Sequence, residues 1–161
     1  MNGEEHLISM LVNNKPGVLS RVAGVFGRLG YNIESLCVAA TTDPEISKIT
    51  LVSKSNSDST ERTKKQLEKL VDVVEVTELG QIQSVQRELI LIGIKLQQEH
   101  RAEIARAVDI FGCKIISMKS DYYILEVVDN KEKIETVLNY FAPLGIEEIA
   151  RTGVIALQKD K

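Results

Sequence analysis

The sequence has few aromatic residues: no tryptophan, four tyrosines and three phenylalanines among 161 positions. Segments 7–12 and 46–53 have the composition of β-strands, and neither contains an aromatic side chain. Single-stranded nucleic acids are commonly bound by aromatic rings on such strands and by a basic surface. The chain has 20 basic and 23 acidic residues, for a formal net charge of −3, so we expect no nucleic-acid partner.

Cysteine is also scarce. Cys37 and Cys113 lie far apart and fit no CxxC or Cys/His zinc pattern, which suits a reducing compartment and predicts no metal site. No apolar run approaches the ~18 residues of a membrane helix. Glu4 and Glu5 near the start oppose a secretory signal. We therefore expect a cytoplasmic protein with no membrane partner.

The usual signatures of an active site are missing as well. His6 and His100 belong to no nucleophile, general-base or metal-binding group, and we expect ordinary solvated or hydrogen-bonded histidines there. Gly24, Gly27 and Gly30 lie inside or at the end of an expected helix, whereas a phosphate-binding loop precedes a helix. Close helix packing is the expected role of these glycines. We predict no catalytic residue and no cofactor bound by this chain.

What the sequence does contain is a regular order of strands and helices. Segment 7–12 alternates with period two and ends at the turn-forming run 13–17 (NNKPG). Apolar residues then recur at helical spacing over 17–29, and Gly30 suits the left-handed position after a helix. The remaining elements of the first half are expected to be strands at 32–40 and 46–53, a helix capped by Ser57, Asp58 or Ser59 with Thr63, Leu67, Leu70 and Val71 on one face, and a strand at 73–78.

The second half repeats this order. Its expected elements are a strand at 89–96, a helix with Ile104, Ala107, Val108 and Phe111, strands at 114–118 and 122–128, a helix with Ile134, Val137, Leu138 and Phe141 capped by Asn130, and an extended segment at 146–157. Residues 30–35 (GYNIES) also align with 112–117 (GCKIIS), each after a helix. The duplication predicts two similar units in one chain.

Two consecutive βαββαβ units predict an α+β fold of two ferredoxin-like domains, each with two helices on one face of an antiparallel sheet. We place the first domain at 1–80, a polar linker at 81–86 and the second domain at 87–161. Apolar residues occupy both sides of the first strand, with Leu7 and Leu11 opposite Ile8 and Met10. Packing between the halves or between chains must cover the second face, and at least a homodimer is expected.

One loop has the features of a ligand site. In the run 13–17, Gly17 permits a close approach by another group, and the amides at the start of the next helix carry partial positive charge. A carboxylate is favoured there, and the amide oxygen of Asn32 can accept a hydrogen bond from an ammonium group. Together these groups suit an amino acid. An ordinary strand-to-helix turn fits the same residues equally well.

Several runs carry a resemblance to a known family. Residues 14–22 (NKPGVLSRV), 28–36 (RLGYNIESL) and 65–73 (KQLEKLVDV) resemble the amino-terminal ACT domain of acetolactate synthase (acetohydroxyacid synthase) small regulatory subunits. Residues 85–89 (VQREL) and 150–154 (ARTGV) resemble their carboxy-terminal domain. The resemblance extends over nearly the whole chain and identifies 1–80 as an ACT domain and 87–161 as an ACT-like domain.

The resemblance implies a non-catalytic subunit that binds a large, thiamine-diphosphate-dependent catalytic subunit. It implies activation of that subunit and feedback inhibition by a branched-chain amino acid, typically valine, bound between two ACT domains of a dimer. By position, the carboxylate end of the effector is surrounded in one protomer by Asn14, Gly17, Val18 and Leu19. Asn32 and Ile33 come from the other protomer, and Ala39 lines the approach.

Two other functions remain open on the sequence alone. A free-standing tandem-ACT sensor of amino acids could act on another enzyme, a transporter or a transcription system. A small ferredoxin-like enzyme is the third possibility. Among effectors, an apolar pocket separates valine from leucine or isoleucine by only ~1 to 3 kcal/mol, so the preference for valine comes from the resemblance.

Overall fold

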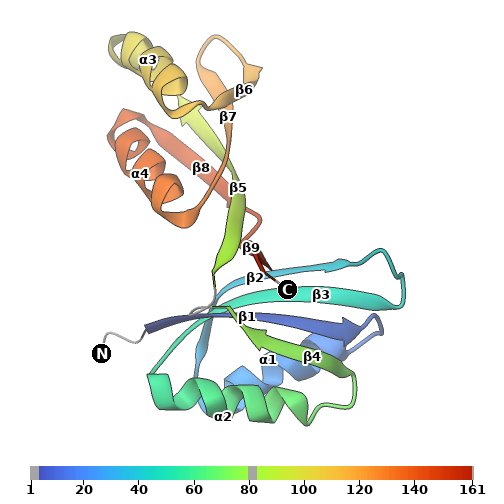
Figure 1. Ribbon diagram of the computed structural model, residues 1–161. Coiled ribbons are helices and arrows are strands. Elements are labelled where there is room, and N and C mark those ends of the chain that lie inside the picture. Colours follow the sequence, from blue (N-terminus) through green and yellow to red (C-terminus); the bar gives the residue numbers. More distant parts are fainter. Residues whose placement is uncertain (1–3, 80–82, 161) are drawn as a thin grey trace. The chain divides into compact units, whose positions relative to one another are not determined.

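The computed structural model describes residues 4–79 and 83–160, which form two compact units. Unit 1 consists of residues 4–79, 83–85 and 154–160, and unit 2 of residues 86–153 (Figure 1). The chain therefore passes from unit 1 to unit 2 and returns. Within the described residues, no helix combines the length and the apolar character needed to span a bilayer.

Unit 1 has the element order βαββαβ. Its elements are β1 (Glu4–Asn13), α1 (Val18–Leu29), β2 (Asn32–Ala40), β3 (Ile46–Ser55), α2 (Ser57–Glu68) and β4 (Val73–Glu78). The strands form an antiparallel sheet in the order β2-β3-β1-β4, and Figure 1 shows α1 and α2 on the same side of it. This is the ferredoxin-like arrangement that the sequence predicts.

The alternation of side chains along β1 determines which face of this sheet is covered. Ile8, Met10 and Val12 point to one face, and each is at most 2% exposed. The core that they form is completed by apolar residues at helical spacing in α1 and by residues of β3, α2 and β4: Val18, Val22, Val25, Phe26, Ile49, Leu51, Leu67 and Val76. The period-two strand and the amphipathic helix thus meet on their apolar sides.

Unit 2 repeats this arrangement around a core of its own. Its elements are β5 (Ser84–Lys95), which begins in unit 1, η1 (Gln98–His100), α3 (Arg101–Phe111), β6 (Lys114–Met118), β7 (Tyr122–Asp129), α4 (Lys131–Phe141), η2 (Ala142–Leu144) and β8 (Ile146–Arg151). The sheet order is β6-β7-β5-β8. Ile90, Ile92 and Ile94 of β5 are fully buried against residues of both helices. The prediction of two ferredoxin-like units is confirmed.

Local signals at helix ends are also confirmed. Gly30 follows α1 with φ +73°, in the left-handed region where glycine is favoured. Asn130 caps α4, and its side-chain oxygen accepts a hydrogen bond from the Lys133 N–H at 3.0 Å. Both ends are set by interactions within a few residues, which is why the sequence alone identifies them.

Helix α2 differs from the prediction at both ends. The sequence predicts a cap at Ser57, Asp58 or Ser59, whereas Asn56 occupies the capping position. The helix ends at Glu68, and Val71 beyond it is 92% exposed, so its predicted place on the buried helix face is wrong. The α-helical spacing no longer applies there because the chain turns into β4.

The last segment of the chain also differs. The sequence predicts one extended segment at 146–157, whereas the structure has β8 and then β9 (Ile155–Gln158), separated by a break at Gly153 with φ +83°. Residues 154–160 after this break belong to unit 1, although the predicted second domain includes them. β9 pairs with β5, and the Lys159 N–H donates to Gln83 O at 3.0 Å.

The predicted linker at 81–86 falls partly outside the described residues. Positions 81 and 82 lie outside them, as do the ends of the predicted domains at 1–3, 80 and 161. From Ser84 onward the linker is strand, because β5 begins at that residue. The chain passes from unit 1 into unit 2 between Val85 and Gln86.

The returning segment covers part of the second face of the unit 1 sheet. Val154 and Ala156, 8% and 5% exposed, pack with Leu7 of β1 and with Leu79. The Val154 N–H donates to Ser35 Oγ in β2 at 3.1 Å. Leu7 lies on the face opposite Ile8, so part of the apolar surface that needs a cover is covered by the same chain.

We expect Val154→Ala to destabilise unit 1 by about 2 kcal/mol, because two buried methyl groups are lost and a cavity remains. Ile155→Ala is the matched control, since the neighbouring side chain is 53% exposed. It should change the stability by less than about 0.5 kcal/mol. Hydrogen exchange of the β1 and β3 amides in the full chain measures both changes. Loss of protection in β7 instead would contradict the assignment of 154–160 to unit 1.

Candidate functional site

The loop between β1 and α1 is held by two neighbouring turns. The main-chain N–H of Asn13 donates to Asp72 O at 2.8 Å, and that of Asn14 donates to Glu45 O at 2.7 Å. The side-chain amide of Asn14 also donates to Pro44 O at 2.9 Å. Asn14, one of the predicted effector residues, therefore ties the loop to the connection between β2 and β3.

Gly17 has the conformation that makes a glycine necessary. Its φ is +85° and its ψ is −10°, and it occupies the capping position of α1. A Cβ atom added there would lie 3.2 Å from Nη1 of Arg21, which curves back over the turn. An L-residue is therefore disfavoured both by its backbone conformation and by the guanidinium beside it.

The start of α1 has main-chain N–H groups without a side-chain acceptor, and the Val18 N–H donates to Lys15 O at 3.4 Å. No side chain caps it, and its first turn contains no acidic residue. Its first intrahelical bond runs from the Arg21 N–H to Gly17 O at 3.1 Å. The side chain of Val18 is 3% exposed and belongs to the core, whereas that of Leu19 is 38% exposed. The geometry therefore suits a carboxylate bound by main-chain N–H groups with Leu19 beside it.

Asn32 and Ile33 lie at the other end of the same sheet. Asn32 pairs with Lys54 of β3, whereas Asn13 pairs with Ile46 at the opposite end of that strand. Eight residues of strand correspond to about 26 Å. Ala39 pairs with Lys48 and so lies at the end that carries the loop. Within one chain, Asn14, Gly17, Val18, Leu19 and Ala39 thus lie at one end of the sheet, and Asn32 and Ile33 lie at the other end.

Asn32 is exposed at the beginning of the edge strand β2. Its Nδ2 donates to Glu34 Oε1 at 2.8 Å, and its main-chain O accepts from Ser53 Oγ at 2.9 Å. With Nδ2 engaged, the Oδ1 atom is the acceptor that the side chain offers to a ligand. Ile33 is half-buried against the core of unit 1, which fixes the start of β2.

His6 has hydrogen-bond partners on several elements of unit 1. Nδ1 of His6 lies 2.8 Å from Thr60 Oγ1 and 3.1 Å from Glu78 Oε1, and Nε2 lies 3.2 Å from Ser55 O. These contacts join β1, β3, β4 and α2, which is a wider network than the local hydrogen bonding expected from the sequence. Within the described residues, no cluster of three histidine, cysteine or acidic side chains is arranged to hold a metal ion.

The two cysteines differ in their surroundings. Cys113 is buried, as expected for a small apolar residue, and this burial raises the pKa of its thiol. Cys37 in β2 is only partly buried, so the expectation that both are buried holds for one of them.

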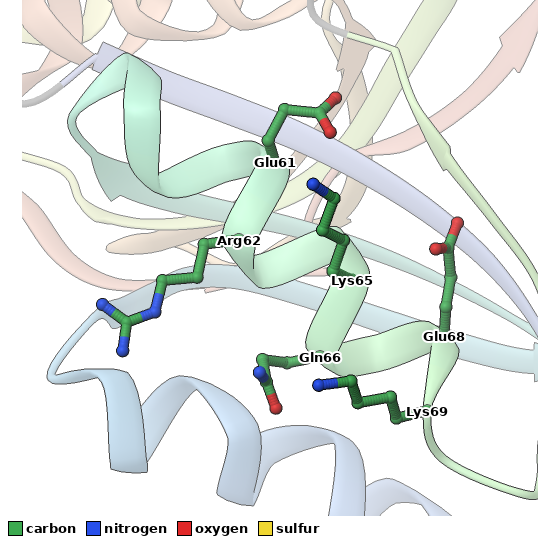
Figure 2. A pocket seen from close by; sticks show the side chains of 6 residues that line it. All are labelled: Glu61, Arg62, Lys65, Gln66, Glu68 and Lys69. Carbon is green, nitrogen blue, oxygen red and sulfur yellow. The ribbon is translucent and has the colours of Figure 1, made fainter.

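A depression along α2 is separate from the predicted site. Six long polar side chains of this helix and its C-cap line it: Glu61, Arg62, Lys65, Gln66, Glu68 and Lys69 (Figure 2). Both signs of charge occur along it, and among the described residues all that line it belong to this helix and its C-cap. This pattern is typical of a solvated helix face.

Comparisons with known proteins agree along the whole chain. Residues 8–75 match the family described as "AHAS small subunit-like ACT domain", and residues 87–160 match "Small subunit of acetolactate synthase". A probable acetolactate synthase small subunit of Archaeoglobus fulgidus is 40% identical over 153 residues, 95% of this chain and 96% of that protein. The chain belongs to the acetolactate synthase small-subunit family.

Other members of the family are similar to the same extent. The acetolactate synthase small subunit of Mycolicibacterium smegmatis is 38% identical over 154 residues, 96% of this chain and 91% of that protein. The crystal structure of the acetolactate synthase small subunit from Thermotoga maritima has a TM-score of 0.88 at 38% identity, and the match covers 98% of this chain and 99% of that one. The family resemblance found in the sequence is confirmed.

In the present chain, unit 2 lacks the features of the unit 1 loop. The connection from β5 to α3 contains the short helix η1 in place of a glycine turn, and no glycine there has a positive φ. Glu99 lies in η1, and Glu103 lies in the first turn of α3. Two acidic residues at a helix start disfavour a carboxylate, so the start of α3 lacks the features that suit a carboxylate at the start of α1.

One group at the loop, the side chain of Asp72, is not predicted from the sequence. Its Oδ1 accepts from Asn13 Nδ2 at 3.2 Å, and its Oδ2 accepts from Arg21 Nη2 at 2.5 Å. These bonds from Asn13 and Arg21 hold the pKa of the Asp72 carboxyl below its ordinary value. A lone acidic residue between Val71 and Val73 is the only signal in the sequence, because its partners are about 50 and 60 positions away.

Gly17→Ala should lower the stability of unit 1 by about 1 to 2 kcal/mol, because a residue with a Cβ is forced into the left-handed region. Gly27→Ala in α1 is the matched control, and it should raise the stability of unit 1. Apart from its chain neighbours and the backbone of its own helix, no described atom lies within 4 Å of the position of its Cβ, so its expected role in close helix packing is wrong. Alanine favours a helix interior by up to ~1 kcal/mol over glycine.

Urea unfolding of the two glycine variants, with hydrogen exchange to assign the change to unit 1, tests the conformation of the loop. Equal effects of the two substitutions would show that Gly17 is no more constrained than a solvent-exposed helical glycine.

Proposed function

We propose that this chain is the regulatory subunit of an acetolactate synthase. In this proposal it binds and activates a large catalytic subunit and confers feedback inhibition by a branched-chain amino acid, with valine as the effector. The observation that carries the proposal is the division of the predicted site. Its carboxylate-binding loop and its ammonium-binding Asn32 lie at opposite ends of one sheet, about 26 Å apart along β3.

A dimer with two-fold symmetry joins the two halves. β2 is an edge strand of the unit 1 sheet, so one side of its backbone is available for pairing. Antiparallel pairing of β2 with its copy in a second chain places the Asn32 end of one strand beside the Ala39 end of the other. Each of two identical sites then contains the loop of one chain and Asn32 of its partner.

The chemistry of the two halves is complementary to a free amino acid. The uncapped start of α1 offers N–H groups to the carboxylate, and Asn32 Oδ1 accepts from the ammonium group. Exposed Leu19 and half-buried Ile33 supply apolar surface for a branched side chain. This division of roles supports valine, leucine or isoleucine as ligands and disfavours a charged side chain.

The partner follows from the family. The relatives are named small subunits of acetolactate synthase, and the matched regions include both units of this chain. We assign the thiamine diphosphate and the reaction itself to a large catalytic subunit. A free-standing sensor acting on another system is the weaker candidate, because relatives of this name match 95% or more of the chain.

A reconstitution experiment tests this function. The large subunit is assayed alone, with the purified chain, and with the chain plus L-valine. We expect the chain by itself to form no acetolactate, to raise the rate of the large subunit, and to make that rate valine-sensitive. A coupling free energy of ~1 to 3 kcal/mol between effector and partner corresponds to changes of several-fold to about 100-fold.

D-Valine is the matched ligand control for the reconstitution. It exchanges the positions of the side chain and the ammonium group relative to the carboxylate, so it should inhibit far less than L-valine. A rate that is unaffected by the chain when both proteins are folded would contradict the regulatory assignment. Equal inhibition by both enantiomers would contradict the proposed three-point recognition.

A further inference from the structure

We propose that Asp72 is a positioning residue that sets the geometry of the effector loop. The inference rests on the proposed function, since the ligand is the amino-acid effector assigned to that loop. It adds a residue that lies outside the predicted site and whose main role is to hold two other side chains. Asp72 itself immediately precedes β4 and is 8% exposed.

Asp72 contacts the chain on both sides of the loop. Before the loop, Asn13 donates to it twice, from its main-chain N–H to Asp72 O at 2.8 Å and from Nδ2 to Oδ1 at 3.2 Å. After the loop, Arg21 Nη2 donates to Oδ2 at 2.5 Å. One buried residue therefore fixes the end of β1 and the first turn of α1 relative to each other, and residues 14–17 span the interval between them.

Arg21 transmits this constraint to Gly17. Its Nη1 atom lies 3.2 Å from the position that a Cβ of Gly17 would occupy, so the guanidinium forms a wall against the turn. The carboxylate of Asp72 holds the guanidinium in that place and balances its charge. Without Asp72, the guanidinium is released and the turn loses one of its supports.

Asp72→Asn is the most selective variant, because it preserves the shape of the side chain and the main-chain bond to Asn13. A carboxylate accepts from two donors at once, whereas an amide offers one acceptor oxygen and one NH₂ group. Asn13 Nδ2 and Arg21 both donate here, so one of the two bonds must be lost and two N–H groups face each other. The loop should loosen while the fold of unit 1 is retained.

The matched control is Glu78→Gln, which also replaces a carboxylate of unit 1 by an amide. Glu78 lies at the other end of β4, where its Oε1 accepts from His6 at 3.1 Å. Binding of L-valine to the full chain is measured by calorimetry for the wild type and both variants, with thermal unfolding recorded on the same samples. We expect Asp72→Asn to bind L-valine roughly 10-fold more weakly, as it would if the loosened loop kept its binding arrangement in about one chain in ten, and Glu78→Gln to bind it as the wild type does.

Arg21→Gln and the double variant Asp72→Asn/Arg21→Gln complete the test. Arg21→Gln alone replaces Asp72→Asn as the test if that variant does not fold. Because both residues belong to one network, each single variant should weaken L-valine binding and the double variant should weaken it no further. Tighter or unchanged binding in Asp72→Asn would overturn the inference. So would equal weakening in Glu78→Gln at the same loss of thermal stability, since Asp72 would then act through stability alone.

The result for the wild type separates this inference from the function on which it rests. Wild-type chain that binds neither L-valine, L-leucine nor L-isoleucine contradicts the proposed function, and the role of Asp72 falls with it. Wild-type chain that binds L-valine, together with an Asp72→Asn variant of equal affinity, overturns only the positioning role.

Discussion

Strand β3 determines where each half of the proposed effector site lies in unit 1. It pairs antiparallel with β1 on one side and with β2 on the other, so β1 and β2 run in the same direction. The loop that follows β1 and the residues that begin β2 therefore lie at opposite ends of the sheet. Because this register is fixed by ten consecutive residue pairs between β1 and β3, local flexibility cannot join the halves within one chain. In the proposed dimer, effector binding and dimer formation are therefore linked, and each should strengthen the other.

The segment that returns from unit 2 to unit 1 is bound by β2, the strand that carries Asn32 and Ile33. Arg151 holds Glu88 through two hydrogen bonds of 2.7 and 2.9 Å, which ties β8 to β5 close to the points where the chain enters and leaves unit 2. Directly after the return to unit 1, the Val154 N–H donates to Ser35, two residues beyond Ile33. The strand that carries half of the site thus also anchors the segment that leaves unit 2.

Most of the fold could be predicted from the sequence because it depends on short-range patterns. The period-two alternation of β1, the helical spacing in α1 and the signals at Gly30 and Asn130 are each complete within a few residues. The return of 154–160 to unit 1 could not be predicted, because it depends on Leu7 and Leu79, which no local pattern links to β9. The turn at Gly17 can be predicted for the same reason as the helices, because the run 13–17 is complete within five residues. The distance between this loop and Asn32 could not be predicted, because it depends on the register of the strands. The contacts of Asp72 could not be predicted either, because its partners are distant in the sequence and meet it only in the folded chain.

The central claim, that each site is shared by two chains, is tested most directly with mixed dimers. Asn32→Ala removes the ammonium acceptor, for a loss of roughly 10- to 150-fold in L-valine affinity. Gly17→Asp places a carboxylate beside that of the ligand in the other half. A dimer with one chain of each kind, isolated with two different affinity tags, contains one site with both halves intact and one with both altered. We predict that it binds one L-valine with wild-type affinity, although neither parent dimer does. A mixed dimer without any wild-type site would contradict the account, because a site contained in one chain cannot be restored by mixing.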